Sequence, residues 1–151
     1  MEQLIASELV ALLEGKVTLI TGAVSGIGRE TATKFIEDGA KVVIADIQQE
    51  LEQETENELE LNATFIACNV TRESDISSAV DFAIYKYNKL DIIYNNAGIA
   101  YRTTPSIVDL DLYMFDRVMA VNVSNAVEGI KRASRVSFLL QTYTRIKTLA
   151  I

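Results

Sequence analysis

The sequence contains no histidine, one cysteine and one proline among its 151 residues. Without histidine the chain cannot build a Ser-His-Asp triad, a zinc–histidine site or a dehydrogenase mechanism that needs a histidine base. The single cysteine, Cys68, excludes an internal disulfide framework and a CxxC metal site. No apolar run reaches the ~18 residues that a membrane-spanning helix requires. We therefore expect neither a metal centre nor a membrane partner.

The composition is typical of one globular domain, with 49% hydrophobic and 23% charged residues. The net charge of −7 and the pI of about 4.6 argue against a nucleic-acid partner. Residues 1–13 are predicted to form an amphipathic lead-in helix, and their acidic character is unlike that of a secretory or transit peptide. Together with the free cysteine, this predicts a cytoplasmic protein.

Short apolar segments alternate with longer segments of helical periodicity. The apolar segments are 17–20, 42–45, 64–67 and 91–94, and the helical ones are 27–38, the acidic stretch 50–60, a segment around 76–84, and 109–135. Near-continuous apolar strands separated by helices are typical of parallel βαβ units. The pattern predicts an α/β fold: the amino-terminal part of a Rossmann-type, doubly wound parallel sheet, with about four strands in the order 3-2-1-4.

A glycine-rich loop, Thr21-Gly22-Ala23-Val24-Ser25-Gly26-Ile27-Gly28, lies between the first predicted strand and the first helix. Gly22 permits a sharp exit from the strand, Gly26 lets backbone N–H groups approach a pyrophosphate, and Gly28 allows close helix–sheet packing. The alternative is that these glycines serve only a tight turn. The strand before the loop and the helix after it favour dinucleotide binding.

Asp46 ends the second predicted strand, eighteen residues beyond Gly28. A carboxylate there can accept hydrogen bonds from the 2′-hydroxyl of an adenosine ribose and would repel a 2′-phosphate. No Arg or Lys occupies the glycine loop or residues 47–49, so NAD is favoured over NADP. Asp46 as a helix N-cap is an alternative role that is compatible with the first.

The spacing G-x-x-x-G-x-G resembles that of the short-chain dehydrogenase/reductase family. Three further segments match family motifs: Asn95-Asn96-Ala97-Gly98 at the end of the fourth strand, Asn122 as the asparagine of the Asn-Ser-Tyr-Lys tetrad, and Asn69-Val70-Thr71, where the family usually has Asp-Val-Thr beside the adenine. Taken alone, Asn95 and Asn96 could be turn-forming residues and Asn122 a helix-interior amide. Residues 13–17 and 90–94 look like plant members that oxidise secondary alcohols of terpenoids and phenylpropanoids.

The resemblance implies hydride transfer between NAD and a secondary alcohol or ketone. It implies a catalytic role for Asn122 and cofactor contacts from twelve residues: Gly22, Ser25, Gly26, Ile27, Gly28, Asp46, Ile47, Asn69, Val70, Asn96, Ala97 and Gly98.

The serine, tyrosine and lysine of the tetrad have no convincing counterpart. Beyond Asn122 the chain has one Y-x-x-x-K, Tyr143 to Lys147, but Tyr143 lies only 21 positions after Asn122 and the family needs about twice that. We interpret the pair as a chance match. The expected organisation is an incomplete NAD-binding domain over 14–136 and a divergent tail over 137–151, as in a truncated product. The alternatives are a non-catalytic nucleotide-binding partner of full-length relatives, or an incorrect gene model.

Without a fifth strand, Ile92 and Ile93 would lie at an open sheet edge, which predicts self-association. Tyr85, Tyr87 and Tyr113 are interpreted as packing residues, and Cys68 as an inert core residue.

Overall fold

The computed structural model describes residues 12–51, 62–100, 106–139 and 147–150. Most of the predicted lead-in helix, most of the acidic helix and Tyr143 lie outside these ranges.

Five parallel strands form one sheet in the order β3-β2-β1-β4-β5. They are β1 (Val17–Thr21), β2 (Lys41–Asp46), β3 (Ala63–Ala67), β4 (Ile92–Asn95) and β5 (Lys147–Ala150). The predicted Rossmann-type fold and the order 3-2-1-4 are thus confirmed. Every residue of β1 and β4 is buried, as expected for strands covered on both faces.

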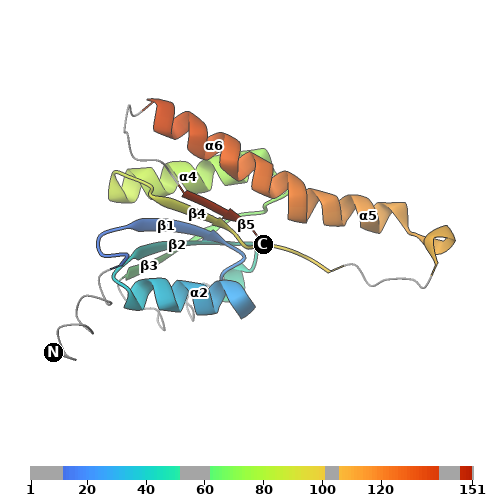
Figure 1. Cartoon of the computed structure of the whole chain (residues 1–151), viewed down its shortest axis with the longest axis horizontal. Helices are drawn as coiled ribbons and strands as arrows, with labels where there is room; N and C mark the ends of the chain where they lie inside the picture. The colour runs from blue at the N-terminus through green and yellow to red at the C-terminus, as the bar shows by residue number, and fades with distance from the viewer. Residues whose placement is uncertain (1–11, 52–61, 101–105, 140–146, 151) are drawn as a thin grey trace.

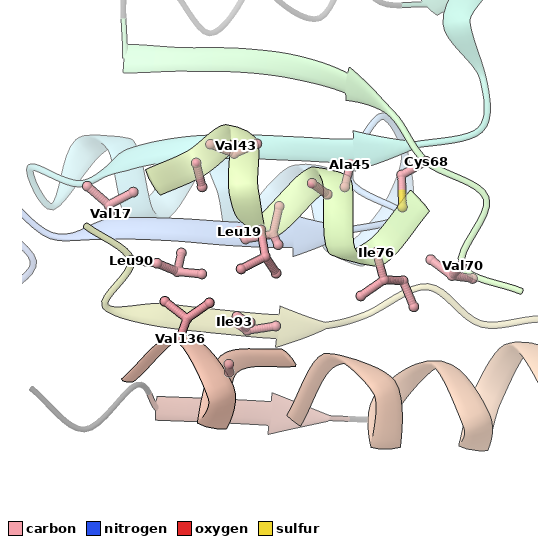
Figure 2. Packing of buried hydrophobic residues seen from close by; sticks show 14 residues of the cluster. Val17, Leu19, Val43, Ala45, Cys68, Val70, Ile76, Leu90, Ile93 and Val136 are labelled. Atoms are coloured by element: carbon pink, nitrogen blue, oxygen red, sulfur yellow. The ribbon is translucent and has the colours of Figure 1, made fainter. Parts of the chain in front are cut away.

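Helices cover the sheet on both sides (Figure 1). Helix α2 (Gly26–Glu37) packs on one face, and α4 (Glu73–Tyr87) and α6 (Asn125–Leu139) pack on the other. Because strand side chains alternate, Leu19 and Ile93 point into the core under α4 and α6, as Figure 2 shows, whereas Ile20 and Tyr94 belong to the core on the α2 side. Two short 3₁₀ helices, Gln49–Leu51 and Ile107–Asp109, complete the described elements.

The predicted helix 109–135 is two helices joined by a π-helical turn. Helix α5 (Leu112–Met119) begins after Asp111, whose Oδ1 accepts hydrogen bonds from the backbone N–H groups of Tyr113 and Met114 at 2.9 and 3.4 Å. The π turn spans Ala120–Ser124 and leads into α6. Helix α5 extends away from the sheet, whereas α6 lies along it (Figure 1). Across the described ranges, no helix combines the length and apolar character needed to cross a bilayer.

The expectation that β4 forms an open edge is wrong. Strand β5 pairs with β4 in parallel from Ile92–Lys147 to Asn95–Ala150. Helix α6 ends at Leu139, so residues 140–146 connect it to β5. The sequence pattern predicts no strand beyond 91–94, whereas β5 lies in the segment 137–151 that is expected to be a divergent tail.

Asp91 links the amino ends of the central strands β1 and β4. Its buried carboxylate accepts a hydrogen bond from the backbone N–H of Val17 at 2.9 Å and lies 3.1 and 3.6 Å from the ammonium groups of Lys89 and Lys16. A buried charge is stable in such a place because it is both paired and hydrogen-bonded. Asp91 thereby fixes the alignment of β1 with β4, and hence that of the loops at their other ends.

Candidate functional site

A cavity of about 860 Å³ lies where β1, β2, β3 and β4 end. This edge is where parallel doubly wound sheets bind their ligands. The cavity is lined by the glycine loop, the ends of β2 and β3, the segment after β4, and α5 with the start of the π turn.

The segment after β4 is hydrogen-bonded directly to the glycine loop. The side-chain amide of Asn96 donates to the carbonyl oxygens of Thr21 and Gly22 at 3.0 and 2.9 Å. In return, the Thr21 hydroxyl oxygen accepts from the backbone N–H groups of Asn96 and Ala97, both at 3.1 Å. These four bonds hold the two loops as one unit, although they lie some seventy-five residues apart in the sequence.

Two glycines make this close approach possible. Gly22 has a φ of +67°, and a Cβ there would lie 2.8 Å from Cα of Ala97. A Cβ on Gly28 would collide with the amide nitrogen of Asn96 and with the carbonyl oxygen of Gly22. Side chains at these positions would therefore separate the helix from the loops that form the cavity floor.

The start of α2 is open to an anion. Ser25 occupies the N-cap position, but its side chain makes no capping hydrogen bond, and the first turn contains no acidic residue. The backbone N–H groups of that turn therefore have no capping partner from the cap residue, and the positive end of the helix dipole is not neutralised locally. Ser25 and Ile27 both line the cavity, so phosphate oxygens placed there can accept hydrogen bonds from this turn.

Asp46 is held rigidly at the end of β2. Its side chain is 5% exposed; Oδ2 accepts from the backbone N–H of Val24 at 3.2 Å, and Oδ1 accepts from the backbone N–H of Gln48 at 3.1 Å. A carboxylate has about four lone-pair sites, so capacity remains for a ligand hydroxyl. Asp46 thus links the glycine loop to the segment after β2 while it lines the cavity.

The segment after β3 is ordered by its own polar groups. Oδ1 of Asn69 accepts from the backbone N–H and the hydroxyl of Thr71 at 3.0 and 2.8 Å, and the backbone N–H of Asn69 donates to Asp75 at 3.0 Å. Cys68 precedes this turn. Burial, with the negative charges of Asp75 and Asp46, raises the pKa of its thiol to about 12. The thiol is therefore protonated at neutral pH and is a poor nucleophile, as the sequence analysis expected.

Asn122 lies in the π turn and braces the segment after Gly98. Its Oδ1 accepts from the backbone N–H of Ile99 and its Nδ2 donates to the carbonyl oxygen of Ile99, both at 2.9 Å. A π turn accommodates one extra residue in a helix and is frequent at functional sites. Here it aims the Asn122 amide at the loop.

Ten of the twelve predicted cofactor-binding residues line this one cavity: Gly22, Ser25, Ile27, Asp46, Ile47, Asn69, Val70, Asn96, Ala97 and Gly98. Gly26 and Gly28 do not line it; Gly28 supports the loop from beneath. Asn122 does not line it either, and contacts it through Ile99.

The wall that α5 and the π turn provide is not predicted by the sequence pattern. Five of their residues line the cavity: Tyr113, Asp116, Arg117, Ala120 and Val121.

The interpretation of Tyr85 and Tyr113 as packing residues is wrong, since their side chains are 87% and 69% exposed. The periodicity of 109–135 indicated a helix but not where its ends lie. Gln48 is not among the predicted site residues, although its position two residues after Asp46, to which its backbone N–H donates a hydrogen bond, could have indicated it.

Lys147 begins β5 and pairs with Ile92, at the amino end of β4. Asn96 to Gly98 follow the opposite end of that strand. The structure therefore does not bring the backbone of Lys147 to the cavity edge.

Comparison with known proteins agrees with this geometry. A family model described as short chain dehydrogenase matches residues 16–145. Short-chain dehydrogenase reductase 4 of Arabidopsis thaliana is 48% identical over 130 residues, which are 85% of this chain and 43% of that protein. Secoisolariciresinol dehydrogenase of Forsythia intermedia is 43% identical over 140 residues, 92% of this chain and 50% of that protein.

Among solved structures, 3-ketoacyl-(acyl-carrier-protein) reductase from Brucella melitensis complexed with NADH superimposes with a TM-score of 0.75 at 38% identity, covering 80% of this chain and 49% of that one. The chain thus spans about half the length of the curated relatives it matches. Since the family model covers most of the chain and the site carries the matching motifs, the protein belongs to the short-chain dehydrogenase/reductase family.

Proposed function

We propose that the cavity binds NAD and that the chain is the nucleotide-binding part of an oxidoreductase acting on a secondary alcohol or a ketone. The observation that carries this proposal is the buried Asp46 carboxylate, which lines the cavity beside an uncapped helix start. The uncapped first turn of α2 suits a pyrophosphate, and the glycine loop leaves room for it. When bound, the nicotinamide would supply or accept the hydride.

NAD rather than NADP is supported by the surroundings of Asp46. Its near neighbours are Val24 and the neutral Gln48, and no ion pair of Asp46 exists within the described residues. A 2′-phosphate would meet an uncompensated negative charge in a buried place, which is strongly unfavourable. A nicotinamide cofactor also fits the NADH-bound structural neighbour.

Replacing Asp46 should remove this discrimination. A hydrogen bond to a charged group contributes about 1.5–3 kcal/mol, so Asp46→Ala should weaken NAD binding by about 10- to 100-fold. The difference in affinity between NAD and NADP should become smaller. Asp46→Asn removes the charge but keeps an acceptor for the Val24 N–H, so it should disturb the glycine loop less than Asp46→Ala does. Titration calorimetry with both dinucleotides is the measurement, and Glu30→Gln on the exposed side of α2 is the control. Equal affinity of the unmodified chain for NAD and NADP would contradict the assignment.

We also propose boundaries for the nucleotide-binding unit and a cellular compartment for the protein. We place the unit at 14–136, with residues 147–150 of the following tail contributing β5. The buried, unpaired Cys68 supports a reducing compartment such as the cytoplasm. Asn122 is proposed to act on catalysis through its two hydrogen bonds to Ile99, which fix the loop beside the nicotinamide end of the cavity.

A second candidate function is association with another copy of the chain. An apolar stripe runs along the solvent side of α5, the π turn and α6, formed by the exposed residues Leu112, Phe115, Met119, Val123, Val127 and Ile130. Contiguous exposed apolar surface of this kind marks interaction sites. Two copies placed antiparallel would cover each other's stripe, so self-association is still proposed although β5 covers the sheet edge.

A charge in the middle of the stripe should separate the copies. We expect the unmodified chain to be dimeric by light scattering and Val127→Glu to be monomeric, because an unpaired carboxylate buried between two helices is costly. Tyr85→Glu, at an exposed position of α4 outside the stripe, should leave the mass unchanged. A monomeric unmodified chain at high concentration would rule out this association.

A further inference from the structure

The wall that α5 and the π turn contribute to the cavity has a feature that none of the family motifs accounts for. Tyr113, Arg117 and Val121 are spaced by four residues and so lie on one face of the helix, and all three line the cavity. Val121 also packs against the buried cluster that contains Val70. Arg117 lies in α5, one helical turn before Val121. Helix α5 extends away from the sheet (Figure 1).

Arg117 is the one cationic residue among those that line the cavity in the described part of the chain. Its side chain is exposed, and within that part of the chain it is not engaged in a salt bridge with any carboxylate. By contrast, Lys131 and Arg132, farther along the same helical stretch, pair with Glu73 and Asp81 of α4. Arg117 is therefore free to meet a ligand.

The proposed cofactor site fixes which part of a dinucleotide faces this wall. The start of α2 would take the pyrophosphate and Asp46 the adenosine ribose. The base then extends beyond Asp46 towards Ile47 and Val70, which line the same cavity. Because Val70, Val121 and Arg117 all line this cavity, we place the turn of α5 that carries Arg117 at the outer side of the base.

We propose that Arg117 is a nucleotide-binding residue whose guanidinium plane stacks on the adenine base. The proposal rests on the proposed function, since it assumes that the cavity holds an adenine nucleotide. A guanidinium is planar and weakly hydrated, and it stacks on aromatic faces, whereas a lysine ammonium offers charge without a plane. Because Arg117 is exposed, stacking on adenine should contribute only the binding free energy of a cation–π contact at a protein surface.

The experiment separates contact with the base from attraction of the phosphate. Binding of AMP and of ribose 5-phosphate is measured by calorimetry, directly or in competition, for the unmodified chain, Arg117→Gln and Arg117→Lys. Arg135→Gln is the matched control, because it removes the same charge from an exposed residue of α6 that does not line this cavity.

We expect Arg117→Gln to weaken AMP binding about threefold to fivefold and to leave ribose 5-phosphate unchanged. Arg117→Lys should recover less than half of the loss, and Arg135→Gln should bind AMP like the unmodified chain. Equal losses for AMP and ribose 5-phosphate, full recovery by lysine, or unaltered AMP binding by Arg117→Gln would each overturn the stacking proposal while leaving the cofactor site intact. An unmodified chain that binds neither AMP nor NAD would overturn both.

Discussion

The purified 151-residue chain should bind NAD and yet show no NAD-linked oxidation of secondary alcohols. Hydride transfer needs a proton donor or acceptor within about 2.6–3.2 Å of the reacting oxygen, and such a group contributes about 10²- to 10⁴-fold to the rate. A tyrosine serves near neutral pH only if a nearby cation lowers its pKa from about 10. The Y-x-x-x-K that follows Asn122, Tyr143 to Lys147, does not bring that cation to the cavity.

The position of Lys147 is the reason. Its backbone pairs with Ile92, three residues before Asn95, which at about 3.3 Å per residue places it about 10 Å from the edge where the cavity begins. Asn122 offers no substitute, because both ends of its amide are bonded to Ile99. In the described part of the chain, the two counterparts of the tetrad, Lys147 and Asn122, therefore do not form a proton-transfer site at the cavity.

The assay follows NADH formation with a panel of secondary alcohols, after calorimetry has shown that NAD is bound. A full-length member of the family is the positive control. We expect a rate indistinguishable from that of Tyr143→Phe and at least about 100-fold below the positive control. Turnover that Tyr143→Phe abolishes would show that the short Y-x-x-x-K is a working site.

A feature of this structure can be predicted from the sequence when it depends on residues that lie close together in the chain. The positions of the glycine loop and Asp46 could be predicted because strand, loop, helix and next strand follow one another within some thirty residues, and each constraint acts on a particular residue. Gly22 needs a positive φ and Asp46 needs a strand end. The order 3-2-1-4 followed from the right-handed crossovers that join such units.

Features that depend on distant partners were missed. Residues 147–150 read Lys-Thr-Leu-Ala, which has little strand character of its own; the ladder of β4 supplies their hydrogen-bonding partners. The apolar pattern of 109–135 runs on through Ala120–Ser124, so the sequence does not show that the turn there is π-helical. Arg117 reads as an ordinary surface residue until the structure shows that it lines the same cavity as Asp46 and Val70.

Gly28→Ala should cause the largest loss of stability and of nucleotide binding from a single methyl group. The new Cβ would collide with the amide of Asn96, the carbonyl oxygen of Gly22 and Cα of Ala23. Two of these atoms are backbone, so rotation of one flexible side chain cannot relieve the collision. Displacing Asn96 would also break its bonds to Thr21 and Gly22, which join the two loops.

Overpacking costs about 1–3 kcal/mol, and leaving a buried amide unpaired costs about 1–3 kcal/mol more. The sum of about 2–6 kcal/mol corresponds to a fall of about 5–20 °C in Tm for a chain of this size. NAD affinity should fall by at least tenfold at a temperature where the variant is still folded, because the floor of the cavity has moved.

The control is Glu30→Ala, which also places an alanine in α2, two residues further along, but by shortening an exposed side chain. Thermal unfolding followed by circular dichroism, and calorimetry with NAD, should both give values near those of the unmodified chain. If Gly28→Ala melted within about 2 °C of the control and bound NAD equally well, the close contact between α2 and the two loops would not be what holds the cavity in shape.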